Sequence, residues 1–296
     1  MKIFDCFMYF DEEILVDLRL NYLNNFVDQF VIVESQFTHS GKKRNLLFNL
    51  NKFNEFKHKI EYLVIDHEPP EIETINDNDD ENTKSKKYIL NAVKRENYQR
   101  NFLSKGLDNS KEEDIIIVSD VDEIPKIENI SFNKIKNKFI FFQQKMFYYK
   151  FNLCLNSFKW YGSKACKKKH LISPQWLRNI KDRSYPFWRL DTFFSKNKKQ
   201  NIYFINDGGW HFSYLKSAED IEKKLKSYLH HREYDIEPIG VQKIKKMINE
   251  KRAVYNLKAD MRSSKFSTGQ SLTKIDLHHL PNYIQNNVNK YKEWLE

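Results

Sequence analysis

Residues 114–125 constrain the fold of this chain most, because a short apolar run leads directly into a cluster of acids. Residues 115–118 are all β-branched, which is typical of a strand buried on both faces in a parallel sheet covered by helices. Pro125 ends the strand pattern. In open α/β sheets ligands bind beyond the carboxyl ends of the strands, so these acids are predicted to lie at a ligand site.

Asp120, Asp122 and Glu123 follow this strand within four positions. Three carboxylates so close together repel one another, and a divalent cation relieves the repulsion because hard cations bind carboxylate oxygens. Mg²⁺ or Mn²⁺ would keep water ligands and also bind the phosphates of a substrate. Asp-x-Asp alone is a weak motif, and a solvated acidic turn is the alternative interpretation.

The N-terminal half predicts alternating strands and helices. Strands are expected at residues 3–9, 30–33 and 60–65, with helices at 12–23 and 86–103. Asp11 is the predicted N-cap of the first helix. The first strand, helix and strand form a parallel pair by default. Residues 68–83 are acidic and poor in apolar residues, which indicates a loop.

The second predicted helix carries Glu96 and Arg100, which are four residues apart and share one helix face. They form either a surface ion pair or a phosphate site in which Glu96 orients Arg100. The second interpretation follows from the planar guanidinium, which donates two hydrogen bonds at once to a phosphate.

Two later segments are candidates for a binding site. The stretch 139–155 is rich in aromatic residues and predicts one strand or two. Aromatic faces also stack on sugar rings, so an acceptor cleft lined by aromatic residues is expected from Tyr148, Tyr149, Trp160 and Tyr161. His211 follows two glycines, and its neutral imidazole is a ligand for Mn²⁺ or a donor to a diphosphate, unless it is a satisfied core histidine.

The segments Ser-Asp-Val-Asp-Glu-Ile-Pro at 119–125 and Gly-Trp-His-Phe-Ser-Tyr at 209–214 together resemble glycosyltransferase family 17. That is the family of the β-1,4-mannosyl-glycoprotein β-1,4-N-acetylglucosaminyltransferases. The resemblance extends over most of the chain. It implies an α/β fold of the GT-A type, with a mostly parallel central sheet flanked by helices. We expect a catalytic domain over residues 1–235 and a C-terminal helical extension over residues 236–296.

The resemblance also implies a chemistry. The expected donor is UDP-N-acetylglucosamine, transferred with inversion to a β-linkage on a glycan or lipid-linked glycan. Mn²⁺ or Mg²⁺ is expected on Asp120, Asp122 and His211. The expected donor contacts are Glu34, His39, Glu96, Arg100 and Asp120. A carboxylate must accept the proton of the acceptor hydroxyl, and the candidates are Asp207, Glu123 and Asp191, of which Asp207 is slightly favoured because it lies beside the His211 motif.

Composition narrows the partners and the location. Lysine and arginine exceed aspartate and glutamate by 50 to 40, which suits an anionic partner and allows contact with a membrane surface. Three cysteines without paired spacing fit a reducing compartment. No apolar stretch of about 18 residues predicts a membrane span, and no signal peptide is seen, so a cytoplasmic location is expected.

Two other function classes remain open. A basic, aromatic-rich protein could bind nucleic acid or an anionic surface, although no nucleic-acid module is recognisable and no nucleic-acid partner is expected. A metal-dependent nucleotide-sugar hydrolase could use the same acids without an acceptor sugar.

Overall fold

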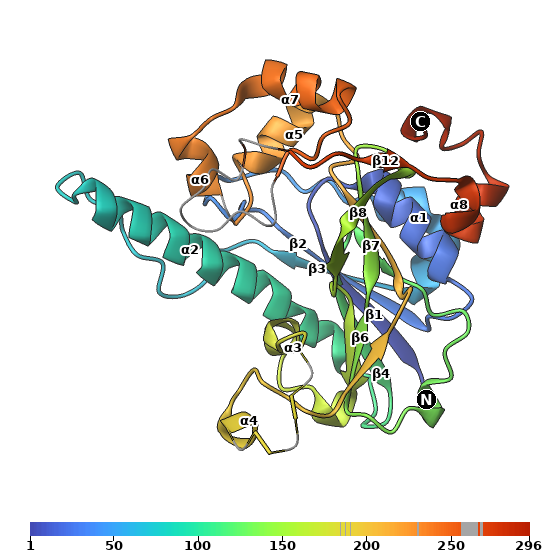
Figure 1. Cartoon of the computed structure of the whole chain (residues 1–296). Helices are drawn as coiled ribbons and strands as arrows, with labels where there is room; N and C mark the ends of the chain where they lie inside the picture. The colour runs from blue at the N-terminus through green and yellow to red at the C-terminus, as the bar shows by residue number, and fades with distance from the viewer. Residues whose placement is uncertain (184, 187, 190, 230, 256–265, 267–268) are drawn as a thin grey trace.

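The computed structural model describes residues 1–183, 185–186, 188–189, 191–229, 231–255, 266 and 269–296. These residues form two β-sheets flanked by helices (Figure 1). The predicted α/β class is therefore confirmed.

The larger sheet of the described residues has the strand order β10-β6-β9-β4-β1-β2-β3. Its strands in chain order are β1 (Ile3–Tyr9), β2 (Gln29–Ser35), β3 (Ile60–Ile65), β4 (Ile115–Asp120), β6 (Phe139–Phe142), β9 (Lys164–Lys167) and β10 (Ile202–Ile205). β1 is parallel to β2 and β4, as the N-terminal pattern predicts, and the pairs β2–β3 and β6–β10 are also parallel. Only β9 runs antiparallel to its described neighbours.

The smaller sheet of the described residues has the order β12-β8-β7-β11-β5. Its strands are β5 (Glu123–Pro125), β7 (Gln144–Tyr148), β8 (Leu153–Trp160), β11 (Gly209–Ser213) and β12 (Thr273–Lys274). The aromatic stretch 139–155 thus forms β6, β7 and the start of β8. Since β5 begins three residues after β4 ends, the acidic turn lies where the chain passes from one sheet to the other.

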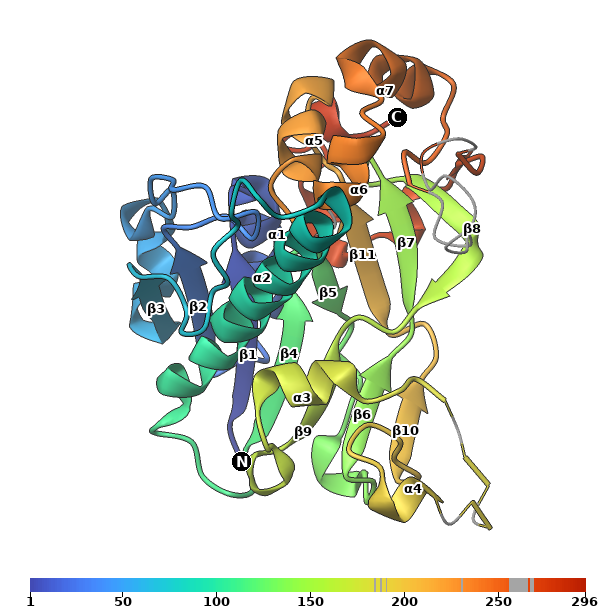
Figure 2. The same ribbon diagram turned by 90° about the vertical axis from the view of Figure 1, so that its left-hand side faces the viewer.

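Helices cover both faces of the larger sheet. The α-helices are α1 (Glu13–Leu23), α2 (Glu81–Phe102), α3 (Pro174–Asn179), α4 (Asp191–Phe194), α5 (Ala218–Leu225), α6 (His231–Ile236), α7 (Gly240–Asn249) and α8 (Asn282–Asn286). Short 3-10 helices span Leu50–Lys59, Leu103–Leu107, Phe132–Lys134, Lys168–His170, Leu277–His279 and Lys292–Trp294. α2 crosses one face of this sheet (Figure 2), and α1 with α8 covers the other (Figure 1).

The core explains the sequence of β4. Ile115 and Ile117 pack in the cluster on the α1 side, whereas Ile116 and Val118 pack in the cluster on the α2 side. The strand is therefore buried on both faces, which confirms the prediction from its β-branched run.

Two predicted helix starts are wrong. Glu12, rather than Asp11, precedes α1, and no side chain caps that helix. α2 begins at residue 81 instead of 86, because the Asp80 carboxylate accepts the backbone N–H of Thr83 and caps the helix. The acidic loop predicted over residues 68–83 therefore ends at residue 80.

The C-terminal segment returns to the smaller sheet. β12 pairs with β8, and the backbone N–H of Phe151 donates to the carbonyl oxygen of Trp294 at 2.8 Å. The division into two domains at residue 235 stays a prediction. None of the described helices combines the length and the apolar character needed to cross a membrane.

Candidate active site

A cleft of about 850 Å³ lies beyond the carboxyl ends of β1, β2 and β4. Among the predicted site residues that the structure describes, those lining the cleft are His39, Glu96, Arg100, Asp120, Asp122 and His211. Those outside its lining are Glu34, Glu123, Asp191 and Asp207. The fold therefore gathers the metal and phosphate candidates in one place, as expected for the strand ends of an α/β sheet.

A fully buried arginine holds the backbone of the acidic turn. Arg19 on α1 forms a two-point ion pair with Asp5 on β1, with both distances at 2.6 Å. Its Nη1 also donates to the carbonyl oxygens of Asp120, at 3.1 Å, and Glu123, at 2.7 Å. The turn is thus tied to the first strand and helix of the chain, because Arg19 on α1 hydrogen-bonds its carbonyl groups.

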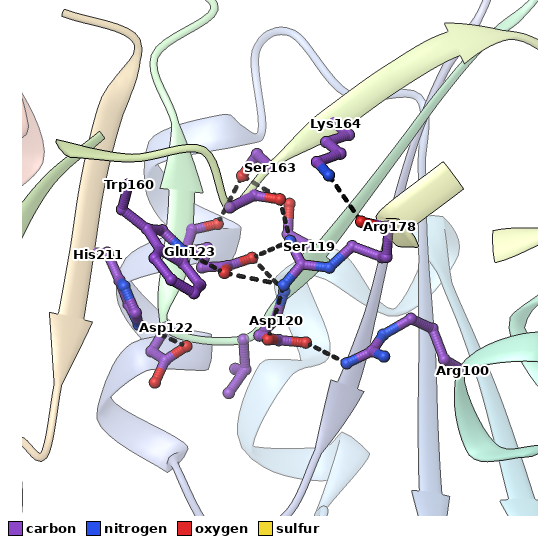
Figure 3. A network of polar contacts seen from close by, with 12 residues as sticks. Arg100, Ser119, Asp120, Asp122, Glu123, Trp160, Ser163, Lys164, Arg178 and His211 are labelled. Atoms are coloured by element: carbon purple, nitrogen blue, oxygen red, sulfur yellow. Dashed lines mark hydrogen bonds and ion pairs between the residues drawn. The ribbon is translucent and has the colours of Figure 1, made fainter. Parts of the chain in front are cut away.

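Asp120 lies between two arginines (Figure 3). Its Oδ1 accepts from Arg100 Nη2 and its Oδ2 accepts from Arg178 Nη2, each at 2.9 Å. Burial raises the pKa of Asp120, but Arg178 and Arg100 outweigh burial and hold the pKa well below its ordinary value. Each carboxylate oxygen of Asp120 therefore accepts a hydrogen bond from an arginine.

Glu123 is completely buried below the cleft. Its Oε1 accepts from Trp160 Nε1 at 2.7 Å, and its Oε2 accepts from the backbone N–H of Asp120 at 2.7 Å and from Arg178 Nη1 at 2.7 Å. Gly162 lies so close that an added Cβ would sit 2.3 Å from the Glu123 carboxyl carbon. This geometry favours a role in holding Arg178 and Trp160; the catalytic role stays a prediction.

Asp122 meets two basic side chains from later elements. Its Oδ1 lies 3.5 Å from His211 Nε2 on β11, and its Oδ2 lies 3.5 Å from Lys224 Nζ on α5. Burial raises the pKa of Asp122, but Lys224 and His211 lower it to about 2. Burial lowers the pKa of His211, yet Asp122 and its neighbouring acids raise it above the ordinary value.

Strand register explains how His211 reaches Asp122. β11 pairs antiparallel with β5, which places His211 opposite Glu123, and the backbone N–H of Phe212 donates to the carbonyl oxygen of Asp122 at 2.8 Å. The centroids of the His211 and Trp160 rings lie 5.3 Å apart. The two sequence motifs therefore meet, although 88 residues lie between Asp122 and His211 in the chain.

The residues present fit a divalent metal held in part by its substrate. Among the described residues, no group of three or more histidine, cysteine, aspartate or glutamate side chains forms a complete metal cage. Asp122 and His211 offer one carboxylate and one imidazole, and His211 Nδ1 is buried without a hydrogen-bond partner in the described part of the chain. Two protein ligands suffice where phosphates and water complete the coordination, as Mg²⁺ prefers.

The predicted pair of Glu96 and Arg100 forms inside the cleft. Arg100 Nη2 donates to Glu96 Oε1 at 2.9 Å, and its Nη1 donates to Gln175 on α3. His39 lies beside them, where its Nε2 is 2.9 Å from Gln99 Oε1 and burial lowers its pKa. Their contact with a donor stays a prediction.

Glu34 supports a loop instead of opening into the cleft. Its carboxylate accepts from Arg44 Nη2 at 2.9 Å and from the Tyr62 hydroxyl at 2.8 Å. It also accepts the backbone N–H groups of Leu47, at 2.8 Å, and Phe48, at 3.0 Å. The side chain is fully buried, so its contacts orient residues 36–48 at the rim of the cleft.

Asp207 and Asp191 lie apart from the acidic turn. Asp207 has a positive φ of 52° and pairs with Lys126 at 3.1 Å and Lys145 at 3.3 Å, beside a second hollow of about 720 Å³. Asp191 on α4 pairs with Arg189 at 2.7 Å and is exposed. Their roles as proton acceptor stay predictions, but neither side chain lines the main cleft.

An aromatic wall forms part of the lining of the cleft. Three of the four predicted aromatic residues line it, namely Tyr148, Trp160 and Tyr161. Tyr149 does not, because its hydroxyl donates to the carbonyl oxygen of Arg252 in a buried position. Tyr214 adds a further ring, 5.8 Å from Tyr148 and nearly parallel to it at 24°.

Sequence reasoning missed the roles of Arg178, Lys224 and Arg19. Lys224 carried a local signal, because it follows Ile221 by three residues and precedes Tyr228 by four, so it shares the apolar face of α5. Arg178 carried no comparable signal, since its acidic partners lie more than fifty residues earlier in the chain.

The sequence of this chain is similar to those of known proteins. The model for "Glycosyltransferase family 17" matches residues 1–296. The human beta-1,4-mannosyl-glycoprotein 4-beta-N-acetylglucosaminyltransferase is 27% identical over 237 residues, which cover 72% of this chain and 40% of the human protein. The rat protein of the same name is 31% identical over 129 residues, or 41% of this chain and 21% of the rat protein.

The chain thus spans about two fifths of the length of the human relative that it matches. The family model, by contrast, covers the chain from end to end. Both motifs that carry the resemblance, at 119–125 and 209–214, contribute to the cleft. The chain therefore belongs to glycosyltransferase family 17.

Proposed function

We propose that this chain is a metal-dependent, inverting glycosyltransferase with a GT-A type catalytic domain. It transfers N-acetylglucosamine from UDP-N-acetylglucosamine to a glycan, or to a lipid-linked glycan, in β-linkage. The observation that carries the proposal is the convergence of Asp122 and His211, 3.5 Å apart, with Arg100 and Arg178 in one cleft. The parallel β1–α1–β2 unit and the acids at the end of β4 support the GT-A type.

The donor diphosphate would lie between Asp122 and Arg100. Asp122 and His211 would hold a divalent metal, which would supply Lewis-acid stabilisation of the charge on the leaving UDP. Arg100 is the arginine best placed to add charge stabilisation, because it is buried and its Nε has no hydrogen-bond partner in the described residues. Lys224 supplies a second, partly buried cation beside Asp122, and its pKa is raised because Asp122 and Glu12 outweigh burial.

The acceptor sugar would stack on the aromatic wall of the cleft. Its hydroxyl oxygen bonds to the anomeric carbon from the face opposite the phosphate, while the bond from that carbon to the phosphate oxygen breaks. The hydroxyl proton passes to a carboxylate, and UDP leaves with the bonding electrons. Tyr148, Trp160 and Tyr214 belong to this aromatic wall, because all three line the cleft.

A carboxylate that accepts this proton has to open into the cleft. Asp182 lines the cleft, is exposed and forms no ion pair with a described residue, unlike Asp120 and Asp122. We therefore add Asp182 to the candidates Glu123, Asp191 and Asp207. The four residues are separated by measuring transfer and donor binding in each amide variant.

Calorimetry of UDP-N-acetylglucosamine binding tests the donor site, with Mn²⁺ and with chelator. The wild type should bind only with metal, and Asp122→Asn should weaken binding at least about tenfold. Asp207→Asn is the matched control, because it removes a carboxylate outside the cleft and asparagine tolerates the positive φ there.

Two results would contradict the proposal. Equal donor binding in chelator and in Mn²⁺ would exclude the proposed metal requirement. Unaffected donor binding in Asp122→Asn would exclude the proposed donor site. A product assay with and without acceptor glycan separates transfer from hydrolysis, because a hydrolase releases N-acetylglucosamine at the same rate in both.

A further inference from the structure

The positive charge of this chain is concentrated in one segment. Residues 164–200 contain eleven lysines and arginines and two aspartates, a net charge of +9, compared with +10 for the whole chain. The described residues of this segment include β9, α3 and α4, which lie towards the lower end of the molecule in Figure 2, away from α5 and α7. Charge concentrated in this way creates a positive electrostatic potential at one part of the protein surface rather than over all of it.

Part of this charge is used internally, and part faces solvent. Lys167 and Lys169 both pair with Glu113, and Lys164 is buried under α3. Lys181, Arg183 and Lys196 are exposed and form no ion pair with a described residue. These three cations are therefore available to an anionic partner.

Large apolar side chains stand in the same region. Phe194 is 91% exposed, Ile172 is 74% exposed and Trp188 is 65% exposed. We call these three residues together with Lys181, Arg183 and Lys196 the basic edge. Aromatic and aliphatic side chains amid unpaired cations are typical of surfaces that enter the headgroup region of a bilayer.

The basic edge is attached to the cleft through α3. On its outer side, Trp176 Nε1 donates to the carbonyl oxygen of Lys196 at 2.9 Å, and the backbone N–H of Lys181 donates to the carbonyl oxygen of Asn197 at 2.7 Å. On its inner side, Arg178 binds Asp120. One short helix thus joins the exposed edge to the acidic turn, and Lys181 itself lines the cleft.

We propose that the basic edge docks this protein on an anionic lipid membrane, with the mouth of the cleft facing the lipid surface. Lys181, Arg183 and Lys196 contact lipid phosphates, and Phe194, Ile172 and Trp188 enter the interface. The docking stands on this surface alone. Its consequence, that the acceptor is a glycan carried by a lipid, rests on the proposed function.

Vesicle sedimentation tests the docking. The full chain should bind vesicles containing one third phosphatidylserine and should not bind phosphatidylcholine vesicles. Binding should weaken strongly between about 0.1 M and about 1 M salt, where the Debye length falls from about 10 Å to about 3 Å. Arg183→Glu with Lys196→Glu should lower the partition constant at least about tenfold, and Phe194→Ser should lower it several-fold.

Lys243→Glu with Lys292→Glu is the matched control, because it removes the same charge from exposed lysines outside the edge. Equal loss in the control and edge variants would overturn the proposal. Tighter binding to a short RNA than to vesicles, with no effect of Phe194→Ser, would also overturn it in favour of a nucleic-acid surface. Donor binding measured on the same variants separates membrane docking from the proposed function. Vesicle binding without donor binding would contradict the proposed function and leave the docking proposal intact.

Discussion

Arg178 binds Asp120 and Glu123 at once, with its Nη2 2.9 Å from Asp120 Oδ2 and its Nη1 2.7 Å from Glu123 Oε2. The arginine comes from α3, whereas both acids lie at the end of β4 and the start of β5. Burial lowers the pKa of Arg178, but Asp120 and Glu123 outweigh burial and raise it above the ordinary value. The acids are therefore neutralised by the protein before any ligand binds.

Replacing Arg178 should destabilise the fold. Arg178→Met leaves Glu123 buried without its charge partner, which should cost about 3 kcal/mol of unfolding free energy. Urea unfolding measures this cost, and a double-mutant cycle with Glu123→Gln isolates the pair. A coupling energy near zero in that cycle would show that the two residues act independently.

The proton acceptor can be identified by comparing amide variants. Asp182→Asn should lower transfer at least about a hundredfold and leave UDP-N-acetylglucosamine binding within about threefold. Asp207→Asn and Asp191→Asn should transfer normally, because their carboxylates pair with lysine or arginine outside the cleft. Intact transfer in Asp182→Asn, or its loss in Asp207→Asn, would reverse this assignment.

The stability of the protein should increase at alkaline pH because of Lys164. Burial, followed by repulsion from Arg178, lowers the pKa of Lys164 to about 7. A lysine whose pKa is lowered on folding binds fewer protons when folded, so stability rises with pH between about 7 and about 10.4. The slope is at most about 1.4 kcal/mol per pH unit. It should disappear in Lys164→Met, as measured by denaturant unfolding at several pH values; an unchanged slope would contradict it.

Glu34→Gln should loosen the cleft rim without removing a donor contact. The loss of charge weakens four hydrogen bonds, to Arg44, Tyr62 and two backbone groups, and should cost about 2 kcal/mol. Limited proteolysis should then cut faster within residues 36–48, while UDP affinity changes less than about threefold. Tyr62→Phe is the control that removes one bond. A large loss of UDP affinity with unchanged proteolysis would instead support the donor contact expected from sequence.

Local patterns predicted the elements that depend on neighbours in the chain. The strand 115–118 follows from a β-branched run that is suited to burial, and the structure has this strand with acidic residues directly after it. The order of strand, helix and strand at the N-terminus was predictable for the same reason. Asp80 was missed as a cap because its signal is a single side chain that accepts one N–H.

Contacts between distant segments were beyond such reasoning. Asp207 was favoured as the base because it is four residues from His211, but the turn between them places its side chain beside Lys126 and Lys145. Glu123 was a candidate because it is acidic, and only the fold reveals that Arg178 and Trp160 occupy its oxygens. Nearness in sequence therefore does not give the position of a side chain that a turn or a long-range partner holds, and the roles of Asp207 and Glu123 as proton acceptor stay predictions.

The partners of Asp122 enter the chain late. His211 follows it by 89 residues and Lys224 by 102, and both are needed to pair its carboxylate. A polypeptide that ended after α3 would contain Arg19, Arg100 and Arg178, which contact Asp120 and Glu123, but neither partner of Asp122. The pairing of the Asp122 carboxylate therefore depends on residues from the last third of the chain.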